Sequence, residues 1–217
     1  PCMTFAQLIA QPMKIHGYGK QQRATRILQI PEKVGLKAEH LNRFPHEFSG
    51  GQRQRISIAR ALSVNPEFVL CDEPLSALDV SVQAQVVNIL QDLQQALGLT
   101  YLFIAHDLSM VRHISDRIGV MYLGTLVEEA PAETLYTEPA HPYTRALLAS
   151  IPVADPHVQM LDQGGIKGEL PGAMSDWPGC KFCNRCPRAM DKCQSQIPVM
   201  PEISPGHRVA CWLFEEK

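Results

Sequence analysis

The sequence lacks long apolar runs and an excess of charge of either sign. Its longest apolar stretches, Phe68–Cys71 and Tyr101–Ala105, fall far short of the roughly 20 residues that span a bilayer. A charged start followed by an apolar segment, which would indicate a signal peptide, is also missing. The 217 residues carry 20 basic and 22 acidic side chains, so the basic excess typical of nucleic-acid-binding domains is absent. We therefore expect neither a membrane span nor a nucleic-acid partner, and the proline at position 1 leads us to expect part of a longer chain.

Cysteine is sparse over most of the chain and becomes frequent near its end. Five of the seven cysteines lie close together in the tail: Cys180, Cys183, Cys186, Cys193 and Cys211. The odd total, the tight spacing and the missing secretion signal argue against a disulfide framework and favour a metal site. Thiolates at this spacing suit zinc or an iron–sulfur cluster, and free cysteines are the third alternative. Because the tail beyond residue 151 has few apolar residues, we expect a metal or cluster to stabilise it.

Three stretches of different pattern follow one another, residues 1–65, 66–130 and 131–217. The first is expected to be mostly helical, and its predicted helices are Met3–His16, Lys20–Ile30 and Ser49–Val64. Pro12 should bend or end the first of these helices, and Pro31 should interrupt the second or start the next turn. The third stretch begins with short helices and continues as a tail rich in proline, glycine and cysteine.

The middle stretch alternates strands with helices. The predicted strands are Phe68–Asp72, Thr100–Ala105, Arg117–Tyr122 and Thr125–Glu129, and the predicted helices are Ser81–Leu97 and Leu108–Ile114. Leu123-Gly124 is expected to form a hairpin turn between the last two strands. This alternation predicts an α/β fold, in which buried parallel strands are covered by helices.

Several segments carry residues suited to phosphate chemistry. Asp72 and Glu73 end a predicted buried strand, where the first carboxylate can hold Mg²⁺ and the second can accept a proton from water. A surface acidic turn is the alternative for this pair. The Ser-Gly-Gly-Gln segment Ser49–Gln52 opens a helix, whose N-terminus favours anions and whose glycines let a ligand approach the backbone. A capping box without a ligand is the alternative there.

Two further segments, His106 and Ser76–Asp79, are candidate ligand-binding segments only because of their positions in the chain. His106 follows the predicted strand Thr100–Ala105, at the strand end where ligands gather in open α/β sheets. A single histidine at such a place is more often structural. Ser76–Asp79 taken alone would be an N-cap turn before the long helix.

Together these segments resemble the ATP-binding-cassette (ABC) ATPases over Phe44–Glu129, which implies a P-loop NTPase-like α/β fold. The resemblance implies a signature motif at Ser49, Gly50, Gly51 and Gln52. It implies that Asp72 is the Walker B aspartate that binds Mg²⁺ and that Glu73 is the catalytic base. It also implies a D-loop at Ser76–Asp79, in which Asp79 binds nucleotide, and a switch histidine at His106. In this family two domains sandwich two ATP molecules head to tail. Each signature motif then touches the γ-phosphate of an ATP held mainly by the opposite domain.

The phosphate-binding Walker A loop of that family, Gly-x-x-x-x-Gly-Lys-Ser/Thr, is missing. The only Gly-Lys pair is Gly19-Lys20, with Lys14 in place of the first glycine and Gln21 in place of Ser/Thr. The family's Q-loop and adenine-stacking loop are missing as well. The resemblance thus implies the helical subdomain (1–65), the second half of the ATPase core (66–130) and a C-terminal extension (131–217). We expect such a fragment to be inactive when isolated.

The tail resembles that of the ATPase subunits of bacterial di- and oligopeptide importers. The segments that carry this resemblance are His141–Thr144, Gly168–Pro171, Pro178–Cys180 and Arg185–Pro187 with the later cysteines. In some members this tail holds a [4Fe–4S] cluster, whose ligands correspond to Cys180, Cys186, Cys193 and Cys211. Cys183 departs from the family pattern and would be a spare or an exchange ligand.

The resemblance also implies where such a subunit works and what it binds. It implies ATP and Mg²⁺ as cofactors, a second ATPase subunit of the same or a different kind, permease subunits and, indirectly, a periplasmic binding protein. The subunit would lie peripherally on the cytoplasmic face of the bacterial inner membrane and hydrolyse ATP to import peptides. The alternatives are an ATPase subunit of a nickel or glutathione importer, and a metal- or cluster-binding module with a vestigial ATPase half, with zinc as the rival to iron–sulfur.

Overall fold

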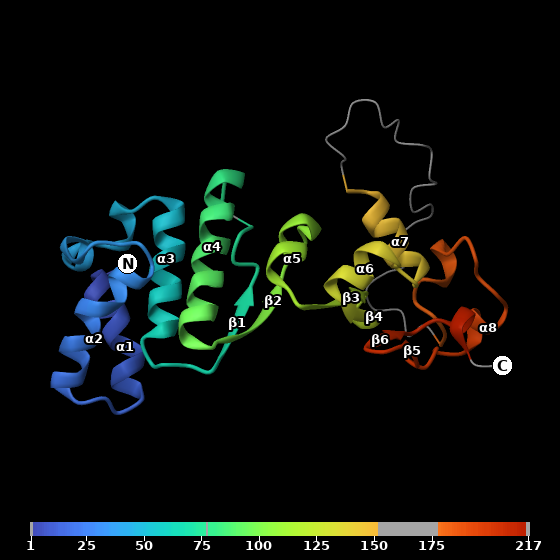
Figure 1. Ribbon diagram of the computed structural model, residues 1–217, viewed down its shortest axis with the longest axis horizontal. Helices are drawn as coiled ribbons and strands as arrows, with labels where there is room; N and C mark the ends of the chain where they lie inside the picture. Colours follow the sequence, from blue (N-terminus) through green and yellow to red (C-terminus); the bar gives the residue numbers. More distant parts are fainter. Residues whose placement is uncertain (1, 77, 152–177, 216–217) are drawn as a thin grey trace. The chain divides into compact units, whose positions relative to one another are not determined.

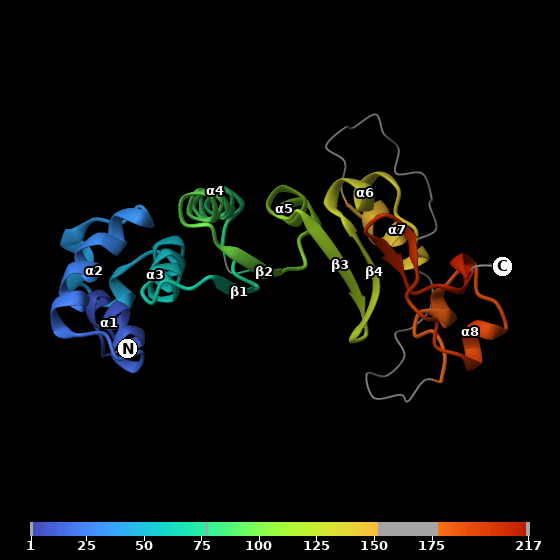
Figure 2. The same cartoon turned by 60° about the horizontal axis from the view of Figure 1, so that its bottom comes forward.

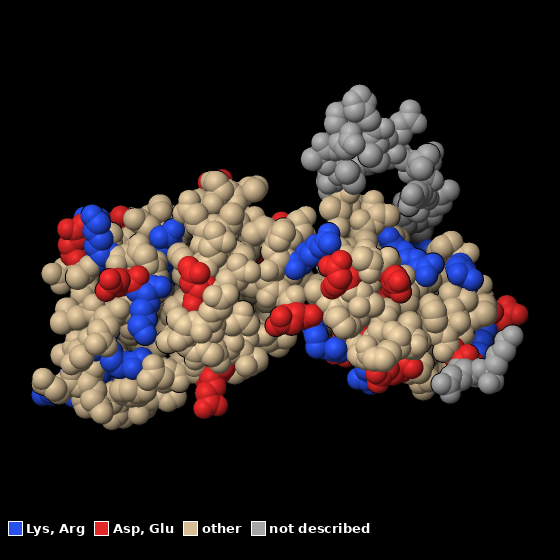
Figure 3. Space-filling view, in the orientation of Figure 1, with Lys and Arg blue, Asp and Glu red and all other residues tan. Residues whose placement is uncertain are grey.

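The structure is a computed structural model that describes residues 2–76, 78–151 and 178–215 (Figure 1). The chain folds as two compact units, Pro1–Met110 and Val111–Lys217. On the face drawn in Figure 3, positive and negative side chains are interspersed over each unit, as the balanced composition leads one to expect. Within the described residues, no helix combines the length and the apolarity needed to cross a bilayer.

The first unit begins with a group of helices around an apolar core. The helices are α1 (Phe5–Ile15), α2 (Lys20–Lys33) and α3 (Gly50–Leu62), and the 3₁₀ turns Ala38–Asn42 and Pro45–Glu47 lie between α2 and α3. Their shared core includes Phe5, Ile9, Met13, Ile30, Val34, Phe48, Ile56 and Leu62. The apolar positions recur every three or four residues, so each helix turns one face to this core.

Pro12 and Pro31 do not end their helices, and the second helix runs three residues beyond its expected end at Ile30. Helix α1 continues through Pro12 to Ile15, and α2 continues through Pro31 to Lys33. A proline removes one backbone hydrogen bond to the preceding turn. Both prolines lie in or near the last turn, and the burial of neighbouring apolar side chains keeps the chain helical.

A two-stranded parallel sheet follows, made of β1 (Phe68–Asp72) and β2 (Thr100–Ile104). Helix α4 (Val80–Leu97) connects the two strands and lies over one face of the sheet (Figure 2). It ends at Gly98, whose φ of 66° is the left-handed conformation that glycine adopts without strain. The predicted strand–helix–strand unit is therefore confirmed to within two residues at each end.

The expectation that both strands are buried is wrong for one face of this sheet. The Tyr101 hydroxyl donates to the Leu90 carbonyl of α4 (3.0 Å), so the face of the sheet that carries Tyr101 is the face covered by α4. Four apolar side chains of the opposite face are exposed by about half: Phe68 (55%), Leu70 (56%), Leu102 (51%) and Ile104 (45%). Among the described residues of this unit, no element covers that face.

The second unit is built on an antiparallel sheet with the strand order β3-β4-β6-β5. The strands are β3 (Arg117–Tyr122), β4 (Thr125–Pro131), β5 (Glu202–Ser204) and β6 (His207–Val209). Leu123 (φ 46°) and Gly124 (φ 74°) form the predicted two-residue hairpin turn between β3 and β4. The remaining helices are α5 (Leu108–Ile114), where the two units meet in sequence, α6 (Ala132–Thr137), α7 (Pro142–Ala149), α8 (Lys192–Ser195) and the 3₁₀ turns Cys183–Arg185 and Trp212–Phe214.

The cysteine-rich tail shares the core of this second unit. Phe182 is 2% exposed, and its ring centroid lies 5.2 Å from that of Tyr122 and 5.4 Å from that of Tyr143. Val209 is fully buried where β6 pairs with β4. The tail therefore gains apolar burial from residues outside itself, which a count of its own apolar residues could not indicate.

Candidate functional site

Glu73 stands in a strained backbone conformation at the carboxyl end of β1. Its φ is 43°, in the left-handed region that costs a residue with a side chain roughly 1–2 kcal/mol. The Glu73 N–H donates to the Ile104 carbonyl of β2 (2.9 Å), and the Glu73 carbonyl accepts from the Ser76 hydroxyl (3.1 Å). These two bonds hold the strained residue, and strain of this kind is concentrated at functional sites.

The parallel pairing brings His106 to Glu73. Asp72 pairs with Ile104, so the segments that leave both strands start at the same edge of the sheet. His106 Nδ1 lies 4.0 Å from Glu73 Oε1, and both side chains are more than half exposed. Asp107 Oδ1 accepts from the Ser109 N–H (2.9 Å) and fixes the turn that carries His106. The carboxylate and the imidazole thus face one another with access for solvent or a ligand.

The segment Ser49–Gln52 forms the capping box that was the alternative to a ligand site. Ser49 Oγ accepts from the Gln52 N–H (3.3 Å), and Gln52 Oε1 accepts from the Ser49 N–H (3.1 Å). A capping box satisfies two donors, whereas the first turn of any helix has four N–H groups without intrahelical acceptors. The N-terminus of α3 therefore keeps the electrostatic character that suits an anion.

Gly50 and Gly51 have different surroundings. A Cβ atom on Gly51 would lie 2.4 Å from Val82 Cγ1 of α4, closer than real contacts allow. A Cβ atom on Gly50 would lie 3.5 Å from Leu78 Cδ2, an ordinary contact distance. Gly51 is thus explained by the close packing of α3 on α4, and this contact places the signature segment beside the D-loop segment that ends at Asp79. Ala77 of the D-loop lies outside the described residues.

Gly51→Ala should lower the free energy of unfolding by about 1–3 kcal/mol, because the added methyl group overlaps Val82. Adding Val82→Ala should recover most of this loss, since it removes the overlapping atom. Urea unfolding followed by circular dichroism measures both variants. Gly50→Ala is the matched control and should not destabilise. Equal destabilisation by Gly51→Ala with and without Val82→Ala would contradict the packing explanation.

The predicted site residues therefore form two groups. Glu73 and His106 face each other at the edge of the sheet. Ser49–Gln52 lies against Leu78 and Val82, just before and within the first turn of α4. No hydrogen bond or ion pair joins the two groups in the described part of the first unit.

The tail cysteines are neighbours in space as well as in sequence. The Cys180 N–H donates to the Cys193 carbonyl (2.8 Å), and Gly179 lies so close to that carbonyl that a Cβ atom would be 2.2 Å away. Burial raises the pKa of Cys180 to about 11, and the nearby Cys193, Cys211 and Cys186 add to this rise. The four cysteines expected to be ligands thus form one electrostatic group.

The cysteine thiols are donors of the type that binds zinc or iron, but their side chains are not arranged as a metal site. Burial also raises the pKa of Cys183, with contributions from Cys193 and Cys186, so the fifth cysteine belongs to the same neighbourhood. Among the described residues, no three His, Cys, Asp or Glu side chains are arranged to hold a metal ion. Soft thiolate donors suit zinc or iron, but their present arrangement is not that of a formed site.

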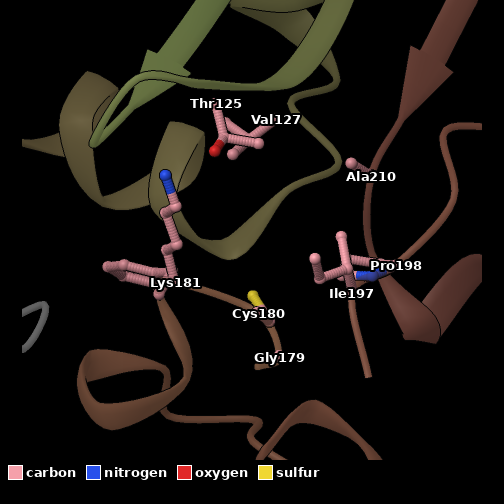
Figure 4. Close-up of a pocket in the computed structure, with 9 residues that line it drawn as sticks. Thr125, Val127, Gly179, Cys180, Lys181, Ile197, Pro198 and Ala210 are labelled. Carbon is pink, nitrogen blue, oxygen red and sulfur yellow. The ribbon is translucent and has the colours of Figure 1, made fainter. Parts of the chain in front are cut away.

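A small pocket reaches the Cys180 thiol from the sheet side (Figure 4). Strand residues Thr125 and Val127 line one wall, and Gly179 and Cys180 line another. Lys181 extends from the cysteine loop to the β3–β4 hairpin, where its Nζ donates to the Leu123 carbonyl (2.7 Å). This bond fastens the cysteine loop to the sheet.

A buried polar cluster in the second unit was not expected from the sequence. Glu128 of β4 is fully buried and accepts from the Ala140 N–H (2.7 Å) and the His141 N–H (2.9 Å). Its Oε1 also lies 2.8 Å from His207 Nε2 of β6. Burial lowers the pKa of His141 to about 4, against the opposing effect of Glu128, so His141 is neutral at pH 7. The cluster joins β4, the start of α7 and the tail strand β6.

Two family models match the chain. The model described as ABC transporter matches residues 3–76, and the model described as oligopeptide/dipeptide transporter, C-terminal region, matches residues 127–193. The first match contains the signature segment and the Asp72-Glu73 pair, and the second contains four of the five tail cysteines.

Similar proteins are found among curated sequences and solved structures. A putative oligopeptide transport ATP-binding protein of Bacillus subtilis is 56% identical over 99% of this chain and 66% of its own length. A putative peptide import ATP-binding protein of Brucella ovis is 50% identical over 97% of this chain and 67% of its own length. A solved dimeric structure of the ATP-binding cassette MJ0796, in a post-hydrolysis state bound to ADP and Pi, is 29% identical with a TM-score of 0.53 and covers 61% of this chain and 58% of that one.

The chain spans about two thirds of the length of the curated relatives it matches. The structural neighbour supports the ABC ATPase fold, with its mixture of helices and sheet. Both family models and the identity to peptide-transport relatives agree with the resemblance carried by the motifs. The chain belongs to the ATP-binding proteins of the oligopeptide and dipeptide ABC transporters.

Proposed function

We propose that this chain forms part of an ATPase subunit that energises the import of di- or oligopeptides across the bacterial inner membrane. The observation that carries the proposal is the facing of Glu73 and His106, 4.0 Å apart, at one edge of a parallel sheet in a chain of this family. The relatives named above are described as peptide or oligopeptide transporters, which supports peptides over nickel or glutathione as cargo. Peptide-dependent phosphate release by the assembled transporter would support the proposal, and peptide import without ATP hydrolysis would remove it.

The chemistry follows from the charges at this edge of the sheet. Glu73 orients a water molecule and takes its proton, and His106 donates a hydrogen bond to an oxygen of the terminal phosphate. Asp72 is exposed at the end of β1, and Mg²⁺ at phosphate sites is often held by one or two carboxylates plus the phosphates themselves, so this residue fits the ion. When bound, Mg²⁺ neutralises charge on the phosphates.

The signature segment would act on the nucleotide of a second ATPase subunit. The N-terminus of α3, with Ser49, Gly50, Gly51 and Gln52, offers backbone N–H groups to the phosphate, and Asp79 lies at the start of the neighbouring α4. The solved neighbour is a dimer bound to ADP and Pi, which supports such an assembly of like or unlike subunits.

A complete site of this kind also needs a phosphate-binding loop, whose sequence pattern Gly-x-x-x-x-Gly-Lys-Ser/Thr does not occur in the 217 residues. We propose that further polypeptide supplies it and covers the exposed face of the β1–β2 sheet. The four apolar side chains of that face support this idea, because water contact with such a surface is unfavourable. The division into a helical subdomain (1–65), half an ATPase core (66–130) and a C-terminal extension (131–217) belongs to the same proposal.

The subunit would work at the cytoplasmic face of the inner membrane, held there by its partners. The helical subdomain would supply part of the surface that docks on the permease subunits. A periplasmic binding protein would deliver the peptide to the permease and so act on this chain only indirectly.

The tail is proposed to hold a [4Fe–4S] cluster through Cys180, Cys186, Cys193 and Cys211.

Anaerobic purification should then give a brown protein with about four iron atoms per chain. The buried thiols must lose their protons to bind metal, so loading should improve as the pH rises. Cys183→Ser is the matched control and should leave the iron content unchanged, whereas Cys186→Ser should lower it. A colourless protein with one equivalent of zinc would show that the tail holds zinc and not a cluster. A protein without metal would show that the cysteines are free.

A further inference from the structure

The C-terminal end of α3 is held by an arginine from α2. Arg26 Nε donates to the Ser63 carbonyl (2.9 Å), and Arg26 Nη2 donates to the Leu62 carbonyl (3.3 Å) and to Asn65 Oδ1 (2.5 Å). Leu62 is the last residue of α3. One guanidinium therefore binds three acceptors where the helix ends, and its planar fork holds these donors in fixed directions that a freely rotating ammonium group does not impose.

The charge of this guanidinium also lies at the favourable end of the helix. The last carbonyls of a helix carry partial negative charge and have no intrahelical donors, so a cation there is stabilising. Tyr18 completes the contact, because its hydroxyl donates to the Val64 carbonyl (3.1 Å) and its ring lies 5.9 Å from the Arg26 guanidinium carbon. Asn65, with φ of 50°, turns the chain away at the same place. Arg26 and Tyr18 thus fix the position at which α3 ends.

The other end of α3 is fixed by the contact of Gly51 with Val82. The helix has 13 residues and so is about 20 Å long. Because the backbone hydrogen bonds of a helix this short keep it stiff, a contact at the C-terminal end also sets the direction in which the N-terminal N–H groups point. Those are the N–H groups of Ser49–Gln52.

We propose that Arg26 is a positioning residue for ATP hydrolysis, acting through α3 on the signature segment. This inference rests on the proposed function, and it adds a residue that never touches the nucleotide. With Arg26 in place, α3 is held at both ends and its N-terminal N–H groups address the terminal phosphate. A displacement of about 1 Å at a site of this kind can lower the rate by roughly 100-fold.

Arg26→Met in the assembled transporter should separate kcat from KM. The variant keeps an unbranched apolar stem and loses all three hydrogen bonds at the end of α3. We expect kcat to fall about tenfold or more while the KM for ATP stays within about twofold, because the phosphate-binding loop is untouched. Arg26→Lys should restore part of the loss. Arg23→Met is the matched control, since Arg23 is another half-buried arginine of α2 but donates to the Tyr18 carbonyl (2.8 Å) and not to the end of α3.

Turnover is counted per bound nucleotide, so a loss of folded protein does not imitate the effect. Equal kcat values in Arg26→Met and Arg23→Met would overturn the proposal, as would a loss that disappears after this normalisation. Amide hydrogen exchange in residues 50–54 gives a readout without hydrolysis, and it should be faster in Arg26→Met than in Arg23→Met. Unchanged exchange there would also count against the proposal. Failure of the proposed function would appear instead as undiminished turnover in Glu73→Gln.

Discussion

Replacing Glu73 by glutamine is expected to reduce ATP turnover by at least about 100-fold and to leave ATP binding intact. The amide keeps the size of the side chain but cannot take a proton from water. It also keeps the left-handed backbone at this position, with φ of 43°, so the free energy of unfolding should not change. Phosphate release and nucleotide binding, measured side by side in the assembled transporter, separate the two effects.

Glu67→Gln is the matched control for this variant, because Glu67 is an exposed glutamate just before the same strand. It should turn over ATP at the wild-type rate. His106→Ala should slow turnover severely, since His106 faces Glu73 across 4.0 Å. Turnover close to wild type in Glu73→Gln would exclude Glu73 as the base.

Replacing Glu128 by alanine is expected to lower the stability of the second unit by about 3–5 kcal/mol. The fully buried carboxylate accepts from two backbone N–H groups and contacts His207, so its removal leaves three buried polar groups without their partner. Urea unfolding followed by tryptophan fluorescence measures this unit, because both tryptophans of the chain lie beyond residue 176.

The neighbouring glutamate provides the control. Glu129 is partly exposed and pairs with Arg117 at 2.8 Å and with Arg208 at 3.7 Å. Glu129→Ala should cost about 1 kcal/mol or less, because ion pairs near the surface contribute little. Equal losses from Glu128→Ala and Glu129→Ala would show that the buried cluster does not hold the tail strand to β4.

Much of the fold could be predicted because its signals are local. Phe68–Asp72 was recognisable as an apolar run bounded by prolines, and the structure has this strand with the same ends. Gly98 and Gly124 were predictable for the same reason, since glycine favours the left-handed conformation that both adopt, whereas Leu123 takes a positive φ of 46° that its side chain disfavours. Pro31 misled, because burial of Ile30 and Pro31 outweighs the lost hydrogen bond and α2 continues to Lys33, whereas the helix that contains Pro12 ends within one residue of its predicted end.

The facing of Glu73 and His106 could also be anticipated, since parallel strands end at the same edge of a sheet. The packing of α3 on α4 at Gly51 could not be anticipated, because it depends on a contact with Val82, 31 residues further along the chain. The same holds for Glu128, whose partners come from α7 and from β6. No pattern within a single strand indicates that a glutamate will be buried among such distant donors.

The most direct measurement is ATP-driven uptake of a labelled oligopeptide into vesicles that contain the assembled transporter. The account predicts that uptake requires ATP, proceeds with the wild-type chain and with Glu67→Gln, and disappears with Glu73→Gln. Peptide uptake that persists in Glu73→Gln, or ATP hydrolysis by the wild-type transporter with no peptide uptake, would contradict it.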